Sequence, residues 1–332
     1  MTSSSPEAAS LEEFGCSRSH VRSVDHDVQT PKVPEAKPRS RLAILSYIAV
    51  CIFWGTSGPA IRYTTHFIVP LWMVILRFSI ASGLLWVFLT LVGKRPPLAG
   101  VRRLLPSALA LAVSNILVTL GFARVESGSG TLLLATTAVS FAVVDRLWPG
   151  GKSKPNGAVW AGLLLGLLGV AVLVLGHDGN ANSHWSGYVM LAISAWSWAL
   201  GSVAQARAPS GLDPLQSSAW QMLIAAALVL PMAILTRQPF PFHTEPNGWL
   251  ALGFLIVTAS LIAFVGFVHM LRHVPAYVAG TYTYVNAVVA ALTGCLWLGE
   301  RLSARFFLAA LLVLSGVALI QYRERHPSHT HA

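Results

Sequence analysis

Charged residues are scarce in this chain of 332 residues. Asp, Glu, Lys and Arg together make up only 11% of it, whereas 54% of the residues are hydrophobic. A typical globular domain is about 25% charged, and so few ionic side chains cannot cover the surface of a soluble enzyme of this size. The excess of apolar residues also excludes intrinsic disorder for most of the chain. The missing charge therefore indicates a protein whose surface does not face water alone.

Residue sets that carry chemistry are scarce as well. Cys16, Cys51 and Cys295 show no paired spacing, so the sequence predicts neither a disulfide framework nor a zinc site. The uncharged segments hold no carboxylate pair and no nucleophile–base pair, which an enzyme embedded in a membrane would need. A Walker-type phosphate loop is also missing from the sequence. We therefore expect no metal, no cofactor and no ATP-driven activity in this chain.

What the chain has instead is a series of long segments without charge. A helix that spans a bilayer needs about 20 mostly apolar residues. Residues 63–76 are too few, and we interpret them as a turn followed by the start of a helix that contains Arg77 and continues through 78–93. A soluble helical core would show polar stripes at the helical period, which these segments lack. The sequence thus predicts an all-α polytopic membrane protein with ten transmembrane helices, from the uncharged segments 42–61, 63–76, 78–93, 104–123, 127–144, 155–177, 179–206, 214–236, 246–271, 273–299 and 306–322.

The two termini differ from the segments between them. Residues 1–40 contain no apolar block and lack the pattern of a secretory signal, so we expect a disordered cytoplasmic tail. Residues 323–332 form a second, short cytoplasmic tail. Its histidines could bind a metal only weakly, and we expect no metal there: they are His326, His329 and His331.

The distribution of Lys and Arg predicts the orientation. With the N-terminus inside, 15 of these residues lie on cytoplasmic segments, and five lie on external ones: Arg62, Arg124, Arg237, Arg301 and Arg305. Because positive charge accumulates on the cytoplasmic side of membrane proteins, both termini are expected in the cytoplasm. The net charge of +10 then reflects topology and contact with anionic lipid. No basic stripe is left for a nucleic acid, and we expect none as a partner.

An internal repeat divides the chain. Four patterns recur at offsets of 144 to 149 residues (54 to 198, for example): Trp54 and Arg62 with Trp198 and Arg207, Arg124-Val125 with His273-Val274, Trp148 with Trp297, and Gly169-Val170-Ala171 with Gly316-Val317-Ala318. We therefore expect one repeat at residues 41–177 and a second at 178–322, each with five spans. An odd number of spans turns the second copy upside down, and such inverted repeats are common in secondary transporters.

Several motifs carry a resemblance to a known family. In their order and spacing they resemble the EamA family of the drug/metabolite transporter superfamily: Phe53-Trp54-Gly55, Ile75-Leu76-Arg77-Phe78, Trp196-Ser197-Trp198, Leu271-Arg272-His273-Val274-Pro275, Tyr282-Thr283-Tyr284-Val285-Asn286 and Leu298-Gly299-Glu300-Arg301-Leu302. The resemblance covers residues 42–322. It implies a ten-helix inner-membrane exporter of small metabolites, with a central cavity lined by the first, third, fourth, sixth, eighth and ninth helices.

The chain departs from this family at two related positions. The family usually has a proline in the middle of the fourth and ninth helices, where this chain has Ala138 and Ala287. We treat both as gating positions, because a proline would remove a backbone hydrogen bond and kink the helix. Without the prolines, any bend is expected at a glycine: Gly128, Gly130, Gly280 or Gly294.

Aromatic and neutral polar residues are the candidate cavity groups. All 13 acidic residues lie in tails, loops or the ends of predicted helices, so the spans offer no evident carboxylate to carry protons. His269 could carry a proton or simply bond between helices, and Arg77 could contact an anionic solute or snorkel to the surface. Each of the remaining candidates could either pack against another helix or contact the solute: Trp54, Ser57, Asn115, Thr136, Thr137, Trp198, Ser202, Tyr282, Tyr284 and Asn286.

Taken together, these features predict a bacterial inner-membrane exporter that works by alternating access. The expected partners are the lipid bilayer and a small solute, namely an amino acid, an amine or an amphipathic drug, moved by facilitated or exchange transport. The alternatives are a proton-coupled multidrug antiporter and, less favoured, a membrane-embedded enzyme or receptor. We expect a monomer or weak homodimer. A ridge of Gly162, Gly166 and Gly169 forms a close-packing face, within the fold or between protomers, and we expect it to pack within the fold because ten helices offer many partners.

Overall fold

A computed structural model gives the fold of the chain. It describes residues 41–94, 96–125, 130, 133–149, 156–174, 185–242, 244–298 and 304–325. The predictions for residues 1–40, for the histidines of the C-terminal tail and for Gly128 lie outside these residues. Every regular element in the described residues is helical: α1 (Arg41–Gly55), α2 (Ser57–Thr65), α3 (Pro70–Leu91), α4 (Val101–Phe122), α6 (Thr137–Leu147), α7 (Gly157–Val174), α8 (Trp185–Arg207), α9 (Pro214–Leu235), α10 (Pro246–Phe254), the π-helix η1 (Leu255–Phe264), α11 (Val265–Met270), α12 (Ala276–Gly280), α13 (Tyr282–Leu298) and α14 (Ala304–Arg325).

The predicted all-α membrane class is confirmed. Six helical stretches are long and apolar enough to cross a bilayer: Arg41–Thr65, Pro70–Leu91, Val101–Phe122, Trp185–Arg207, Pro214–Leu235 and Pro246–Met270. Two more are apolar but shorter, Gly157–Val172 and Phe307–Arg323. The total of ten spans stays a prediction, since length and composition identify six among the described residues.

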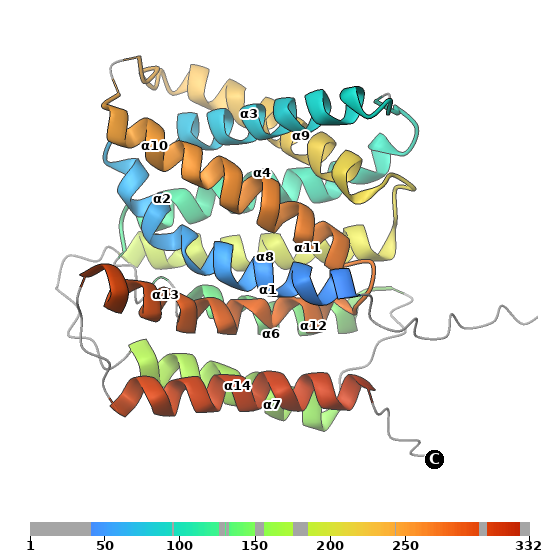
Figure 1. The fold of residues 1–332 in the computed structure, drawn as a ribbon, viewed down its shortest axis with the longest axis vertical. Helices are drawn as coiled ribbons and strands as arrows, with labels where there is room; N and C mark the ends of the chain where they lie inside the picture. The colour runs from blue at the N-terminus through green and yellow to red at the C-terminus, as the bar shows by residue number, and fades with distance from the viewer. Residues whose placement is uncertain are drawn as a thin grey trace, which may run out of the picture. The chain divides into compact units, whose positions relative to one another are not determined.

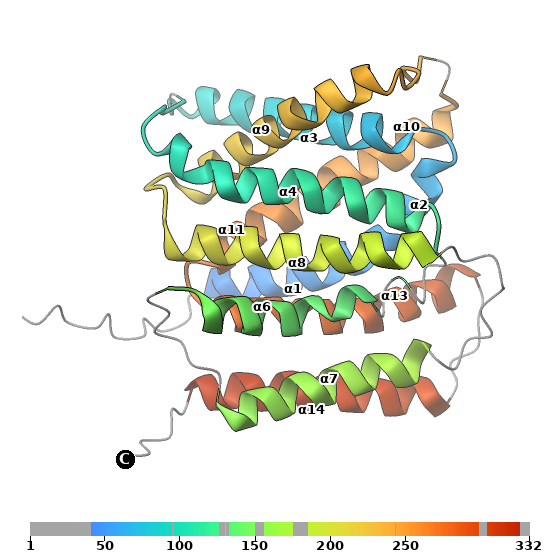
Figure 2. The same ribbon diagram turned by 180° about the vertical axis from the view of Figure 1, so that it is seen from behind.

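Helices far apart in the sequence pack in pairs. The most extensive contacts join α7 to α14, α4 to α8 and α3 to α9, and Figures 1 and 2 show each pair side by side. The starts of α1 and α9 and the ends of α8 and α11 lie at one end of the bundle, to the right in Figure 1. We call this the Arg207 end, after the last residue of α8. The opposite end is the Arg62 end, after a residue in the last turn of α2.

Small residues allow the close approach of α7 to α14. A Cβ added to Gly316 would lie 2.6 Å from the carbonyl oxygen of Gly162, and one added to Gly169 would lie 2.9 Å from the carbonyl oxygen of Ala309. These backbone contacts leave no room for a larger side chain, as is usual for small-residue helix interfaces in membranes. The glycine ridge seen in the sequence therefore packs within the fold, as expected.

Three helices are interrupted at a threonine. Thr56 separates α1 from α2, Thr136 precedes α6, and Thr281 separates α12 from α13. Each hydroxyl donates to the backbone carbonyl three residues earlier, over 3.1, 2.5 and 2.7 Å respectively. Such local bonds compete with the helical ladder and bend the chain. Gly280 ends α12 next to Thr281, and the interruption near Ala138 is at Thr136; that glycines supply the bends stays a prediction.

Candidate functional site

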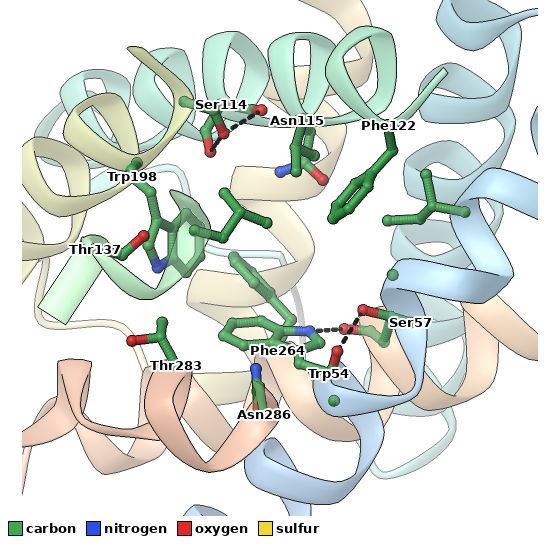
Figure 3. Close-up of a pocket in the computed structure, with 18 of the residues that line it drawn as sticks. Trp54, Ser57, Ser114, Asn115, Phe122, Thr137, Trp198, Phe264, Thr283 and Asn286 are labelled. Carbon is green, nitrogen blue, oxygen red and sulfur yellow. Dashed lines mark hydrogen bonds between the residues drawn. The ribbon is translucent and has the colours of Figure 1, made fainter. Parts of the chain in front are cut away.

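A cavity opens between helices from both halves of the chain. It holds about 960 Å³ of empty space, including its mouth. Its walls come from α1, α2, α3, α4, α6, α8, η1 and α13 (Figure 3), with these described lining residues: Trp54, Gly55, Ser57, Gly58, Ile61, Arg77, Phe78, Leu111, Ser114, Asn115, Val118, Phe122, Leu134, Thr137, Ser194, Ala195, Trp198, Ala259, Phe264, Tyr282, Thr283, Asn286 and Ala290. The family resemblance implied six lining helices; Arg77 and Phe78 add the second span, α3, to them.

An aromatic cluster forms the floor of the cavity. Trp54 of α1 meets Trp198 of α8 edge to face, with ring centroids 5.5 Å apart. The ring of Tyr282 lies 5.0 Å from that of Trp54, and Phe267 lies 5.0 Å from Trp198. Trp54 and Trp198 are the residues that the sequence repeat pairs, and the structure brings their rings into contact. Aromatic pairs of this geometry contribute about 0.5–1.5 kcal/mol beyond the area they bury.

Hydrogen bonds fix the polar groups of the wall. The indole nitrogen of Trp54 donates to the carbonyl of Ala259 over 2.9 Å, in the π-helical segment. Ser114 and Ser194 join α4 to α8 through hydroxyls 3.0 Å apart. With its amide oriented by the surrounding acceptors, Asn286 donates to the carbonyl of Cys51 over 3.0 Å. A π-helical segment exposes backbone carbonyls outside the α-helical ladder, and such segments are frequent at functional sites.

Arg77 brings a positive charge to the cavity wall. Its side chain is almost fully buried, at 5% relative exposure, and its guanidinium donates to the Oδ1 atom of Asn115. The amide nitrogen of Asn115 donates in turn to the carbonyl of Leu111 over 3.0 Å, which keeps Oδ1 toward Arg77. The Nε atom of Arg77 finds no acceptor among the described residues.

The cavity is closed toward the Arg207 end. Its lining stops at Trp198 on α8, at Thr137 on α6 and at Phe264 on η1. Beyond these residues the space between the same helices is filled by a buried hydrophobic cluster that we call the plug: Val50, Cys51, Phe141, Val144, Ala199, Val203, Phe267, Met270, Leu271, Ala276, Ala279 and Tyr282. Toward the Arg62 end, by contrast, the lining continues to Phe122, the last residue of α4.

An ion pair lies beyond the plug. The guanidinium of Arg207, the last residue of α8, contacts the carboxylate of Asp145 in α6 over 2.6 Å. The Asp145 side chain is 2% exposed and that of Arg207 is 23% exposed. This pair therefore joins the ends of α6 and α8 in a setting with little water.

A second polar cluster joins the loops at the same end. Lys94 contacts Asp213 over 2.7 Å, and Asp213 caps α9 by accepting from the backbone N–H of Gln216. Partial burial alone would raise the pKa of Asp213, but the Gln216 N–H and the Lys94 ammonium lower it overall. Arg272 donates to the hydroxyl of Ser217 over 3.2 Å, and burial lowers its pKa while Asp213 opposes that shift. We call Lys94, Asp213 and Arg272 the loop clamp.

The structure brings together most of the site residues predicted from the sequence. Eight of them line the cavity: Trp54, Ser57, Arg77, Asn115, Thr137, Trp198, Tyr282 and Asn286. The remaining six do not belong to its lining: Thr136, Ala138, Ser202, His269, Tyr284 and Ala287.

Three residues of the second set have other surroundings. Tyr284 is fully buried, and its hydroxyl donates to the carbonyl of Leu163 on α7 over 2.7 Å. His269 lies in α11 near the Arg207 end, with its ring 4.4 Å from that of His273. Ser202 is buried on α8 beyond Trp198. These positions lie apart from the lining of the cavity.

Some lining residues escaped the sequence analysis. Ser114 and Ser194 could have been found, since each is a polar residue near the middle of an uncharged span. Phe264 and Phe122 carry no such signal, because one Phe in an apolar segment looks like any other. Their part in the cavity depends on how the helices pack.

Comparison with known proteins places the chain in a family. The EamA-like transporter family matches residues 41–175 and again residues 185–322. The chain belongs to this family. It is 34% identical to the uncharacterized inner membrane transporter YedA of Escherichia coli (strain K12), over 82% of this chain and 88% of that one. It is 25% identical to the uncharacterized transporter YvbV of Bacillus subtilis (strain 168), over 87% of this chain and 94% of that one.

A plant relative and a solved structure extend the comparison. The chain is 24% identical to the WAT1-related protein At3g02690, chloroplastic, of Arabidopsis thaliana, over 83% of this chain and 69% of that one. A crystal structure 22% identical in sequence matches with a TM-score of 0.71, covering 87% of this chain and all of the other. That likeness concerns the fold. The family and the relatives identify a membrane transporter.

Proposed function

We propose that this EamA-family transporter exports small solutes across the bacterial inner membrane by alternating access. The observation that carries the proposal is a cavity walled by both halves of the chain, whose described lining reaches Phe122 toward the Arg62 end and ends at the plug toward the Arg207 end. A carrier needs a central site that reaches one side at a time. The proposed topology has ten spans in two inverted repeats with both termini in the cytoplasm.

The packing of the helices supports the inverted repeat. If α1 corresponds to α8 and α4 to the helix α10–α11, the contact of α4 with α8 has its counterpart in the contacts of α1 with η1 and α11. Likewise, α6 packs on α8 as α13 packs on α1. Inverted repeats of this kind place the solute site between the two halves, where Trp54 and Trp198 meet.

The orientation follows from the charges of the loops. Most of the Lys and Arg residues that the structure describes lie at the Arg207 end, which favours a cytoplasmic position for it. The conformation is then the outward-open one, in which a solute leaves the cavity for the external side. We propose that the Arg207–Asp145 pair and the plug together close the cytoplasmic path.

The wall favours amphipathic solutes. Its described residues combine tryptophan, phenylalanine and tyrosine rings with serine, threonine and asparagine groups, a composition suited to amino acids, amines and amphipathic drugs. Asp145 and Asp213 lie at the Arg207 end, away from the cavity lining. We therefore propose facilitated or exchange transport by a monomer or weak homodimer, with a proton-coupled antiporter as the alternative.

Transport in liposomes tests this proposal. Purified protein would be reconstituted into vesicles loaded with labelled amino acids or amines, with and without a pH gradient. We expect faster efflux than from empty vesicles, accelerated by unlabelled solute outside and unchanged by the gradient. Efflux equal to that of empty vesicles for the whole panel contradicts export. Efflux that requires the pH gradient contradicts the facilitated mechanism and favours the antiporter.

Two substitutions connect the flux to the cavity. Trp198→Ala and Asn286→Ala are expected to lower efflux at least fivefold while the yield of folded protein is unchanged. Trp185→Ala is the matched control, because Trp185 starts the same helix α8 and is 77% exposed. Equal loss of folded protein and of flux would identify Trp198 and Asn286 as packing residues.

The two alanines at the proposed gating positions allow a separate test. Ala138 is the second residue of α6, where a proline costs little because its N–H is not needed in the first turn. Ala287 lies inside α13, where a proline removes a helical hydrogen bond. We expect Ala287→Pro to change the transport rate and Ala138→Pro to change it less. Unchanged rates in both variants would exclude these positions from gating.

A further inference from the structure

The cavity wall carries one charge that the described part of the fold does not neutralise. Arg77 lies in α3 at 5% exposure, and the ion pairs among the described residues join Arg207 to Asp145 and Lys94 to Asp213. A guanidinium has five N–H donors. The hydrogen bond that the structure gives this side chain goes to Asn115, a neutral amide.

A buried charge without a counter-charge is costly. Moving an ion out of water carries a penalty of several kcal/mol, which a neutral amide only partly offsets. The Nε atom of Arg77 is buried and has no acceptor in the described residues, so local hydrogen bonding is incomplete as well. The fold therefore holds a cation in a place where an anionic ligand group would stabilise it.

The surroundings of Arg77 define what else the ligand carries. Phe78 lies next to the guanidinium, 4.6 Å from its central carbon to the ring centroid. Phe122, Phe264, Trp54 and Trp198 line the same cavity as Arg77. A carboxylate pairs with a guanidinium through two parallel hydrogen bonds, while aromatic walls accept an apolar body. The cavity lining thus combines one cationic group, which can bind an anion, with aromatic side chains that can accept an apolar body.

We propose that Arg77, held by Asn115, binds the carboxylate of the transported solute. This inference rests on the proposed export function and narrows its substrate class. The solutes are carboxylates with an apolar or aromatic body, including zwitterionic amino acids. Amines without a carboxylate are excluded, because a positive charge beside Arg77 is repelled.

Binding to three matched probes tests the inference on the wild-type protein. 3-Phenylpropionate has the carboxylate alone, phenylalanine has the carboxylate and an ammonium group, and phenethylamine has the ammonium group alone. Calorimetry and thermal stabilisation of the full chain in detergent would give the affinities. We expect both carboxylates to bind at least tenfold more tightly than phenethylamine. Equal or tighter binding of the amine, or no binding of either carboxylate, overturns the inference.

Substitutions of Arg77 test whether carboxylate binding depends on this residue. Arg77→Gln is expected to weaken carboxylate binding at least tenfold, and Arg77→Lys to weaken it less, because lysine keeps the charge but not the planar pair of donors. Arg124→Gln is the control, since Arg124 is an exposed cation outside the cavity lining. Should Arg77→Gln fail to fold, Arg77→Lys and the three probes still decide. Carboxylate binding unchanged in a folded Arg77→Gln protein overturns the inference.

The same probes separate this inference from the proposed function. Carboxylates that bind through Arg77 but do not cross the membrane contradict export and leave the binding site intact. Efflux of phenethylamine that exceeds efflux of both carboxylates contradicts the carboxylate site and leaves export intact.

Discussion

The two ends of the helix bundle differ in how they are held. At the Arg207 end the plug fills the space between α1, α6, α8 and α11, and the Arg207–Asp145 pair and the loop clamp lie around it. At the Arg62 end the cavity extends to Phe122, and Arg62 is exposed and forms no ion pair with a described residue. At one end the cavity thus stops at a buried hydrophobic cluster with an ion pair beyond it, whereas at the other its described lining reaches the last residue of α4.

This difference is instructive because the proposed inverted repeat makes the two ends equivalent parts of the two copies. Arg62 follows Trp54 much as Arg207 follows Trp198, yet only Arg207 has a carboxylate partner among the described residues. The offset of 149 that relates Ala138 to Ala287 relates Asp145 to Gly294. A glycine cannot repeat the ion pair at that position. The two ends thus differ at single residues, which can be changed one at a time.

The largest effect is expected from opening the plug. Phe267 is 1% exposed and packs on Trp54, Trp198 and Tyr282. Replacing a buried Phe by Ala costs about 3–5 kcal/mol of unfolding free energy, so Phe267→Ala should destabilise the closed end. Cys51, a buried thiol of the plug, reports the change in a Cys16→Ser/Cys295→Ser background. We expect at least tenfold faster labelling of Cys51 by a maleimide.

The matched control for the plug is at the other end. Phe242 is 77% exposed and follows the end of α9. Phe242→Ala should leave both the stability and the labelling rate within twofold of the parent protein. Equal labelling of Cys51 in the Phe267 and Phe242 variants would mean that the plug does not close the path.

A somewhat smaller effect is expected from the ion pair. Asp145→Asn leaves the guanidinium of Arg207 without a counter-charge, and because Arg207 is partly exposed we expect a cost of about 2 kcal/mol, below the value for a fully buried pair. Labelling of Cys51 should rise about three- to tenfold. The double variant Asp145→Asn/Arg207→Gln should be less destabilised than the sum of the single variants. Strict additivity would show that the pair does not hold α6 to α8.

Much of the fold could be predicted from the sequence. The uncharged segments identified the helices because a bilayer sets their length and removes charge from their surface. The repeat predicted that Trp54 and Trp198 correspond to each other, but their ring contact could not be predicted, because it depends on how α1 and α8 pack. The interruptions at Thr56 and Thr136 were not predicted, since a threonine hydroxyl that bonds its own helix has the same sequence signal as one that packs on another.

The site was harder to predict than the fold. Tyr282 and Tyr284 are two residues apart, so their side chains point about 200° from one another around the helix. Tyr282 lines the cavity, whereas Tyr284 reaches α7 and bonds Leu163. Sequence spacing predicts that only one of the two faces the cavity, but which one depends on the neighbours of α13. Arg77 posed the same problem, because its hydrogen-bond partner Asn115 comes from α4 and not from its own helix.

A smaller effect is expected at the loop clamp. The pKa of Asp213 is lowered from its ordinary value of 3.8, so its contribution to stability is present above that value and is lost as the pH falls through the lowered pKa. Lys94 is 50% exposed, and such a surface pair contributes about 0.2–1 kcal/mol. Lys94→Gln should lower the melting temperature by a degree or two, and less so in high salt. Melting curves recorded between about pH 3 and 7, in low and in high salt, measure the dependence on pH and on salt.

The smallest effect is expected from a substitution at the Arg62 end. This substitution tests the difference between the two ends most directly. Arg62→Gln removes an exposed cation that pairs with no described residue, so we expect stability within about 0.5 kcal/mol of the parent protein and unchanged labelling of Cys51. The variant at the corresponding arginine, Arg207→Gln, leaves the buried carboxylate of Asp145 without a counter-charge. It should accelerate labelling of Cys51 as Asp145→Asn does. Because the two arginines occupy corresponding places in the repeats, any general effect of losing a positive charge near a helix end acts on both. A difference confined to Arg207→Gln assigns closure to the ion pair, whereas equal effects in the two variants would mean that the two ends are held in the same way.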